Sequence, residues 1–431
     1  MLLLKGLSRY MGLWTQRRGR AGHPSAQRST ARLRLEALEA RCLLNYSVTD
    51  LGTLGGSTSA AFAINSAGQV AGAADLNATL SHAFFYNGAL TDLGTLGGAN
   101  SGAQGINSAG QVVGGAEINA DGTAHAFLWD SVGGMQDLGT LGGTDSEATA
   151  INDAGQVVGS ADPGVSGQGF HAFLWTSAGG MVDLGTLGGD ASFAYGIDAN
   201  GLVVGESDIT TGTAPPSHAF LFNGTTMIDL GTLGGSDSFA NGINAATGQV
   251  VGGADLPSGD SHAFVWDSVG GMQDLGTLGN GDSAADAVNS CGQVVGSFNV
   301  DAIQAHAFLW TSGGGMVDLN TLLTPGSGWT LEEATAINDC GQIVGCGTGP
   351  GGATDAFLLT PGAGPGAAVR TFASMPSGSM AAAPVANAAS PAGSASDRAV
   401  PPPTAARNEG AALFLSALEG KKHELWTEWS E

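Results

Sequence analysis

Basic residues are absent from most of this chain. Of its 14 Lys and Arg residues, nine lie in residues 1–45 and five in residues 370–431, so residues 46–360 contain none. The same stretch holds 30 Asp and Glu residues, which give it a formal charge of −30. A surface of this sign repels nucleic acids and anionic membranes and attracts cations or basic partners. We therefore expect no nucleic-acid partner, and a fold stabilised by apolar burial and backbone pairing.

Three further absences narrow the class of protein. The four Cys residues are too few for a disulfide framework. No run of about 20 apolar residues occurs, so no membrane-spanning helix is expected. The 72 Gly residues follow no Gly-X-Y period, which excludes a collagen-like chain. Most glycines instead recur at fixed positions, where they resemble turn residues.

One sequence unit is repeated seven times. Each copy reads approximately D-L-G-T-L-G-G, then A-x-x-I-N-x-x-G-Q-V-V-G, then H-A-F-L-W, then G-G-M before the next D-L. Successive D-L pairs begin 42 to 46 residues apart, which is typical of a repeat architecture. The Asp of this pair is Asp50, Asp92, Asp137, Asp183, Asp229, Asp274 and Asp318.

Within one copy the pattern predicts four short strands. In the third copy, residues 148–152 and 156–159 are joined by turn residues and favour a hairpin. Residues 171–175 form a continuous apolar run, as expected for a strand buried on both faces, and residues 181–184 begin the fourth strand. Four strands in one unit are typical of a propeller blade. Asn152 and its equivalents are interpreted as turn residues.

The two ends of the repeat complement each other. The last copy reaches residues 355–359 but no D-L segment follows it, whereas the first D-L segment precedes the first complete copy. A ring explains both facts, so we predict that residues 47–52 pair as a strand with residues 355–359. The alternative is a β-solenoid, which needs atypical capping units that neither end shows. The predicted fold is all-β, a seven-bladed β-propeller closed by an N-terminal strand.

The regions outside the repeat differ from it in composition. Residues 1–45 are basic and contain no apolar segment of the length found in an ordinary signal peptide. Residues 361–408 are rich in Pro, Ala, Gly and Ser and predict a flexible linker. Residues 409–431 have apolar residues at helical spacing, which is consistent with a short amphipathic helix or with a solvated tail.

Two resemblances concern the cellular location. Residues 46–360, with seven copies each of the D-L and A-F elements, resemble the HAF family of extracellular repeat proteins. Residues 34–44 resemble the L-E-P-R-x-L-L element near the N-terminus of exported planctomycete proteins, with Ala40 where that motif has Pro. The resemblances imply an exported or cell-surface protein. They imply no activity, catalytic residue or cofactor.

The repeated histidines are interpreted as structural. Equivalent positions on seven blades are spread around a circle, too far apart to share one metal ion with bonds of about 2 Å. We expect each His to hydrogen-bond within its own blade, with the Asp of D-L as its partner. Six copies carry this residue, as His82, His125, His171, His218, His262 and His306. Asp355 takes the seventh place, beside Asp50, where the pair would need a proton, a water or a cation.

Functional residues are expected where the copies differ, above all in the loops between Q-V-V-G and H-A-F. In one loop, Asp255 and Asp260 are candidate calcium ligands, since calcium binds several carboxylate oxygens; the alternative is a solvated acidic rim. The D-L-G-T-L-G-G segment lacks the Lys and the helix of a phosphate-binding loop. No catalytic residue and no cofactor other than calcium is predicted.

The sequence therefore predicts an acidic, monomeric binding or surface-structural module located outside the cytoplasm. Its expected partner is an extracellular protein or a glycan. The alternative is a hydrolase or lyase that acts on a polysaccharide in the central depression of the propeller. Carboxylates and aromatic side chains grouped in that depression would favour the enzyme.

The charge imbalance gives a first testable prediction. Because residues 46–360 repel one another electrostatically and salt screens charges beyond about 10 Å at 0.1 M, salt should stabilise this region. We expect its melting temperature to rise as NaCl increases from about 10 mM to about 1 M. A flat or falling melting temperature would contradict the prediction.

Overall fold

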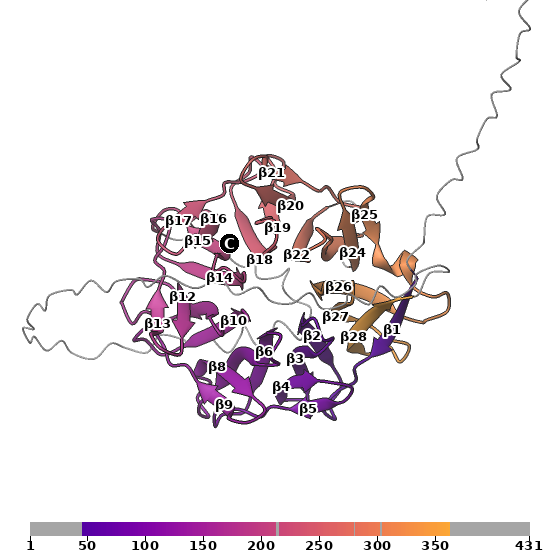
Figure 1. The fold of residues 1–431 in the computed structure, drawn as a ribbon, viewed down its shortest axis with the longest axis horizontal. Coiled ribbons are helices and arrows are strands. Elements are labelled where there is room, and N and C mark those ends of the chain that lie inside the picture. Colours follow the sequence, from indigo (N-terminus) through magenta and orange to yellow (C-terminus); the bar gives the residue numbers. More distant parts are fainter. Residues whose placement is uncertain (1–44, 213–214, 280, 302–303, 363–431) are drawn as a thin grey trace, which may run out of the picture. The chain divides into compact units, whose positions relative to one another are not determined.

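The computed structural model describes residues 45–212, 215–279, 281–301 and 304–362. In these ranges the chain forms seven four-stranded antiparallel sheets, which stand as the blades of a β-propeller around a central axis (Figure 1). The seven-bladed fold predicted from the repeat is thus confirmed. The leader and export element, most of the linker and the C-terminal helix predicted above lie outside the described residues. No helix within the described ranges is long and apolar enough to cross a membrane.

In blades 1 to 6, four consecutive strands follow one another from the axis to the periphery, and in blade 7 the outermost strand is β1. Blades 1 to 3 are β2 (Ser59–Ile64), β3 (Val70–Asp75), β4 (Ser81–Tyr86) and β5 (Leu90–Asp92); β6 (Ser101–Ile106), β7 (Val112–Glu117), β8 (Ala124–Asp130) and β9 (Gly134–Asp137); β10 (Ser146–Ile151), β11 (Val157–Ala161), β12 (His171–Thr176) and β13 (Gly180–Asp183). Blades 4 to 6 are β14 (Ser192–Ile197), β15 (Val203–Asp208), β16 (Ser217–Phe222) and β17 (Met227–Asp229); β18 (Ser238–Ile243), β19 (Val250–Asp255), β20 (Ser261–Asp267) and β21 (Gly271–Asp274); β22 (Ser283–Val288), β23 (Val294–Asn299), β24 (Ala305–Thr311) and β25 (Gly315–Asp318). A short 3-10 helix, η1 (Leu319–Leu322), precedes blade 7, which is β26 (Thr330–Ile337), β27 (Ile343–Thr348), β28 (Thr354–Pro361) and β1 (Tyr46–Asp50).

The N-terminal strand closes the ring, as predicted. β1 is the outermost strand of blade 7 and pairs antiparallel with β28, from Tyr46 opposite Pro361 to Asp50 opposite Phe357. Tyr46 is 1% exposed and packs in the core between blades 6 and 7. Burial raises the pKa of its hydroxyl to about 12. The first strand therefore contributes both backbone pairing and a buried aromatic side chain to the last blade.

One residue triplet recurs across the three inner strands of every blade. In blade 1, Ala61 lies opposite Gly72, and Gly72 lies opposite Phe84. The Gly belongs to the V-V-G motif and the Phe to the H-A-F motif, so the two motifs are neighbours in register. The equivalent Phe residues are completely buried at 0% exposure, namely Phe84, Phe127, Phe173, Phe220, Phe264, Phe308 and Phe357.

The Gly of this triplet is required by a bulge in the innermost strand. The register between β2 and β3 shifts from Ala61 to Ala63, so Phe62 is an extra residue. A Cβ on Gly72 would lie 2.1 Å from the carbonyl oxygen of Ala60, closer than any side chain tolerates. In the other six blades the corresponding distance is 1.9–2.0 Å. Only a residue without a Cβ therefore lets the second strand follow the bulged strand.

Neighbouring blades are linked by the Asn of the I-N motif. The Oδ1 of Asn65 accepts hydrogen bonds from the backbone N–H groups of Ala67 and Gln69, which confirms its predicted turn role. Its Nδ2 also donates to the carbonyl oxygen of Asn107 in the next blade, at 3.0 Å. The same interblade bond is donated by Asn65, Asn107, Asn152, Asn244, Asn289 and Asn338. Asp198 fills this place in blade 4 and has no side-chain N–H to donate.

A buried Ser makes a second link between blades. The Oγ of Ser101 accepts a hydrogen bond from the backbone N–H of Ala83 in the preceding blade and donates one to the carbonyl oxygen of Gly94. Because Ala83 begins the buried part of the H-A-F strand, this bond fixes the strand against the next blade. Six blades contain the Ser, as Ser59, Ser101, Ser146, Ser192, Ser238 and Ser283.

The bulge gives a prediction about stability. Replacing Gly252 by Ala would place a Cβ 1.9 Å from the carbonyl oxygen of Phe239, whereas a Cβ on Gly313 would meet nothing within 4 Å. We expect Gly252→Ala to lower the free energy of unfolding by about 2–4 kcal/mol, because the bulged strand must move. Gly313→Ala, the matched control, should change it by less than about 0.5 kcal/mol. Urea unfolding curves that coincide for the two variants would contradict the bulge as the reason for the Gly.

Candidate functional site

The innermost strands of the seven blades enclose a central cavity of about 380 Å³. Its lining comes from β2, β6, β10, β14, β18, β22 and β26, so every blade contributes one strand to it. Its volume lies at the lower end of the range for small-molecule sites. The cavity is the candidate functional site because it brings together side chains from the whole length of the repeat.

Most of the lining is of the same kind in blades 1 to 6. One ring consists of small residues, and the residues that follow them form an aliphatic ring. The small residues are Ala63, Gly105, Ala150, Gly196, Gly242 and Ala287, and the aliphatic residues are Ile64, Ile106, Ile151, Ile197, Ile243 and Val288. These two rings give the cavity an apolar wall without any feature specific to one blade.

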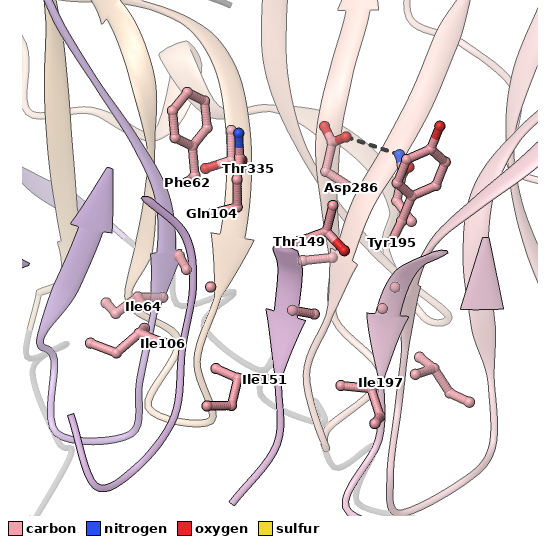
Figure 2. A pocket seen from close by; sticks show the side chains of 18 of the residues that line it. Phe62, Ile64, Gln104, Ile106, Thr149, Ile151, Tyr195, Ile197, Asp286 and Thr335 are labelled. Atoms are coloured by element: carbon pink, nitrogen blue, oxygen red, sulfur yellow. Dashed lines mark hydrogen bonds between the residues drawn. The ribbon is translucent and has the colours of Figure 1, made fainter. Parts of the chain in front are cut away.

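A third ring differs from blade to blade. It consists of the bulge residues, which are Phe62, Gln104, Thr149, Tyr195, Asn241, Asp286 and Thr335. All seven side chains are partly exposed, and Figure 2 shows the labelled ones at one level of the cavity, with the isoleucines at another. We call this set the bulge ring. It contains aromatic, amide, hydroxyl and carboxylate groups, which are the groups of the lining that can bind a ligand specifically.

Two hydroxyls of the bulge ring bind the neighbouring blade. The Oγ1 of Thr149 donates to the carbonyl oxygen of Ala194 at 2.7 Å, and the Oγ1 of Thr335 donates to that of Ala61 at 2.8 Å. Each acceptor belongs to the residue just before the next bulge. The bulge thus places a side chain in the cavity and also joins adjacent innermost strands.

An amide and a carboxylate form a pair in the same ring. The Nδ2 of Asn241 donates to Oδ1 of Asp286 at 3.1 Å, the bond drawn as a dashed line at Asp286 in Figure 2. It also donates to the carbonyl oxygen of Ala285 at 3.1 Å. The pair joins blades 5 and 6. It holds one oxygen of the Asp286 carboxylate in a fixed position at the wall of the cavity.

Glu147 lies beside the bulge ring on blade 3. The Nε2 of Gln104 in blade 2 donates to its Oε1 at 3.4 Å. Burial is the main cause of the raised pKa of Glu147, and this hydrogen bond opposes the rise. The Glu147 carboxyl is therefore one contact away from the lining and is held in a partly dehydrated environment.

A second carboxyl lies behind Tyr195. The Tyr195 hydroxyl donates to Oε1 of Glu206 at 2.6 Å, and the Oγ of Ser217 donates to the other Glu206 oxygen at 3.4 Å. Burial raises the pKa of Glu206 above its ordinary value. Burial, followed by the negative charges of Glu206 and Glu147, raises the pKa of Tyr195 well above its usual range. At neutral pH the Tyr195 hydroxyl thus keeps its proton and is a hydrogen-bond donor that orients the Glu206 carboxyl.

The bulge ring was missed by the sequence analysis, which expected variation chiefly in the loops. The residues that differ lie between the two small residues of A-x-A or A-x-G, inside a strand. Their variation is visible in the sequence, but the register shift that directs them into the cavity is not. The six different residue types found at the seven copies of an otherwise repeated position were the signal that could have identified them.

The candidate calcium ligands lie away from this cavity. Asp255 ends β19, where Ser236 Oγ donates to it at 3.3 Å, and burial is the main cause of its raised pKa. Asp260 is in the following turn and accepts a hydrogen bond from Ser258 Oγ at 2.9 Å. In the part of the chain that the structure describes, no three His, Cys, Asp or Glu residues are grouped so that they could hold a metal ion. Calcium binding at this loop stays a prediction.

The repeated histidines form His–Asp pairs, as predicted. In blade 1 the Nδ1 of His82 lies 2.8 Å from Oδ1 of Asp92, which also accepts the backbone N–H of Gly94. The Asp of D-L thus fixes both the His and the turn after the outermost strand. The six pairs are His82–Asp92, His125–Asp137, His171–Asp183, His218–Asp229, His262–Asp274 and His306–Asp318, all at 2.8–2.9 Å.

Blade 7 has two carboxyls where the other blades have a His–Asp pair. Asp355 lies opposite Gly347 just as His82 lies opposite Ala74 in blade 1. Burial, and then the negative charge of Asp50, raises the pKa of Asp355. The strand pairing that closes the ring therefore carries an electrostatic penalty when both groups are ionised.

No protein-family profile matches this chain, and no curated protein sequence matches it. Among solved structures it is similar to TolB from Acinetobacter baumannii, with 12% identity over 62% of this chain and 63% of that one and a TM-score of 0.41. It is also similar to XC5397 from Xanthomonas campestris, described as a gluconolactonase, with 11% identity over 60% of this chain and 86% of that one and a TM-score of 0.35. A puromycin hydrolase has 13% identity over 67% of this chain and 49% of that one, with a TM-score of 0.41. Likenesses this low say nothing about the activity of this chain.

The carboxyl pair in blade 7 gives a prediction with a defined pH dependence. Because the pKa of Asp355 is raised in the fold, its stabilising contribution is complete at low pH and is lost as the pH rises through that value. Asp355→Asn carries no charge, so its melting temperature should exceed that of the wild type at pH 7. The gain should vanish below the ordinary aspartate pKa of about 4.

His82→Asp is the matched control, since it creates two facing carboxyls in blade 1 and should lower the melting temperature at pH 7. Melting curves measured between about pH 4 and pH 8 follow both effects. A gain for Asp355→Asn that is equally large at both ends of this range would contradict the explanation.

Proposed function

We propose that this protein is an exported binding module that holds a small ligand in its central cavity. The bulge ring carries the proposal. The scaffold residues recur in nearly every blade, whereas the bulge ring contains six different residue types, with Thr at two of its seven positions. A binding site that is made once must be built from the residues that distinguish the blades. The bulge ring provides such residues at one level of a cavity of suitable size.

Export is proposed on the basis of the sequence. The resemblance of residues 34–44 to an export element and of residues 46–360 to extracellular repeat proteins supports it. The absence of Lys and Arg from residues 46–360 is unfavourable for contact with nucleic acid. We further propose that the rim of the monomer faces an extracellular protein or a glycan.

A polysaccharide hydrolase or lyase is the second candidate. The carboxyls of Asp286, Glu147 and Glu206 and the aromatic rings of Phe62 and Tyr195 are grouped at or next to the bulge ring. A raised pKa, as at Glu147 and Glu206, is what a general acid requires. Each of these carboxyls, however, accepts a hydrogen bond from a lining residue, Asp286 from Asn241, Glu147 from Gln104 and Glu206 from Tyr195. The geometry therefore supports binding better than catalysis.

A ligand screen tests the binding proposal. Full-length protein is mixed with small molecules and glycans, and compounds that raise its melting temperature are retested by calorimetry on Phe62→Ala and Val132→Ser. Val132 is 96% exposed at an outer hairpin and serves as the control. We expect Phe62→Ala to weaken binding by at least about tenfold, because aromatic anchors contribute more than 1 kcal/mol. Equal affinity for Phe62→Ala and the wild type would place the site outside the cavity.

The enzyme candidate is tested with the same protein. Polysaccharides are incubated with wild type and Glu206→Gln, and new reducing ends or unsaturated sugars are measured. We expect no products. Products that are formed by the wild type and abolished in a Glu206→Gln variant of unchanged melting temperature would establish the enzyme instead.

A further inference from the structure

We propose that the ligand of the central cavity is an organic amine, whose ammonium group lies at the Asn241–Asp286 side of the bulge ring and whose carbon body lies against the aliphatic ring. The inference rests on the proposed binding function and specifies its ligand. Four properties of the cavity, namely charge, aromatic rings, apolar wall and size, lead to it.

Charge is the first property. Asp286 is in the bulge ring, and the carboxyls of Glu147 and Glu206 are each one hydrogen bond behind it, through Gln104 and Tyr195. No Lys or Arg occurs in residues 46–360 to neutralise them. Burial makes the ionised forms of Glu147 and Glu206 costly, and a positive group nearby lowers that cost. A bound cation would supply this compensation, whereas an anion would be repelled.

Aromatic rings are the second property. Phe62 comes from blade 1 and Tyr195 from blade 4, and both rings belong to the lining of the cavity (Figure 2). An ammonium group within about 6 Å of an aromatic centroid is attracted by the ring face. Aromatic faces also pack against carbon-bound hydrogens, which suits an organic ligand.

The aliphatic ring favours an organic cation over a metal ion as the ligand. Ile106, Ile197 and their equivalents line the cavity next to the bulge ring and offer a surface that only carbon groups can use. Within the described ranges, no three His, Cys, Asp or Glu residues are grouped so that they could hold a metal ion. A cavity with a carboxylate in its lining and an apolar wall matches a molecule with a cationic end and a carbon body.

The volume limits the size of the ligand. The cavity of about 380 Å³ is large enough for a short alkyl chain or one sugar ring, but too small for a folded domain. Two sources offer the same chemistry at this size, namely alkylamines and amino sugars. Both present a primary ammonium on a body rich in carbon-bound hydrogens, so the experiment includes one of each.

Proton linkage offers an independent readout. Burial raises the pKa of Glu147 and of Glu206, so the protein holds protons there at a pH where a free glutamate does not. A bound ammonium group favours the ionised carboxylates. Amine binding should therefore release protons, and the affinity should increase as the pH rises through the raised pKa values. A neutral ligand should show neither effect.

The test is calorimetric titration of the full chain with matched probes. Hexylamine is compared with hexanol, and glucosamine with N-acetylglucosamine. We expect at least one amine to bind about tenfold or more tightly than its neutral counterpart, since a hydrogen bond to a charged group is worth about 1.5–3 kcal/mol. The amine that binds identifies the source, and the dependence of the heat on the buffer reports the proton release.

A pair of charge-removing variants locates the ammonium. Asp286→Asn keeps an acceptor oxygen for Asn241 but loses the charge, and we expect it to weaken amine binding about tenfold while hexanol or N-acetylglucosamine binding is unchanged. Asp260→Asn removes an equal charge from an exposed turn and should leave amine affinity within about twofold. If Asp286→Asn does not fold, Glu147→Gln takes its place; because Glu147 lies on blade 3, it tests the requirement for negative charge and the structure with bound amine gives the position of the ammonium.

Three results would overturn the inference, and they are distinguishable. A neutral probe that binds as tightly as its amine, with loss in Phe62→Ala, would reject the ammonium but leave the cavity as the binding site. Equal weakening by Asp286→Asn and Asp260→Asn would show that only the overall charge attracts the amine. Failure of all four probes, together with an unproductive ligand screen, would reject the cavity as a binding site altogether.

Discussion

The whole fold depends on one close approach between two backbones. In every blade a carbonyl oxygen of the innermost strand occupies the place where a Cβ on the second strand would be. The second strand therefore has Gly at this position. The fully buried Phe of the third strand lies opposite this Gly and covers it. The bulge that creates the approach also turns one extra residue toward the axis. The contact that packs each blade is therefore also what builds the bulge ring.

The links between blades compensate for the absence of basic residues. With no Lys or Arg in residues 46–360, buried hydrogen bonds from Asn and Ser join each blade to the next. Inside the blades, His–Asp pairs join the third and fourth strands. Three places depart from this pattern: Asp198 donates no interblade bond, blade 7 lacks the buried Ser, and Asp355 puts a second carboxyl near Asp50 where the other blades have a His. The ring is thus regular in its packing and irregular at these three places.

Much of the fold could be predicted from the sequence because its signals are repeated. The period fixed the seven blades, the incomplete last copy predicted closure by β1, and the ring geometry led to the His–Asp pairs. The site was harder to predict. A-x-A followed by I-N reads as an ordinary short strand, and nothing local shows that Phe62 or Tyr195 sits at a register shift. The interblade bond of Asn65 was missed for a related reason, since its turn role already satisfied the local pattern.

The division between a repeated scaffold and a variable bulge ring is the central claim. It is tested most directly by an experimental structure of the protein with the amine, hexylamine or glucosamine, that binds in the titration. The account predicts the amine inside the central cavity, with its nitrogen nearest Asp286 and its carbon body along the aliphatic ring formed by Ile64, Ile106 and their equivalents. An amine bound only at the outer rim, or one that lies in the cavity with its nitrogen against the aliphatic ring, would contradict it.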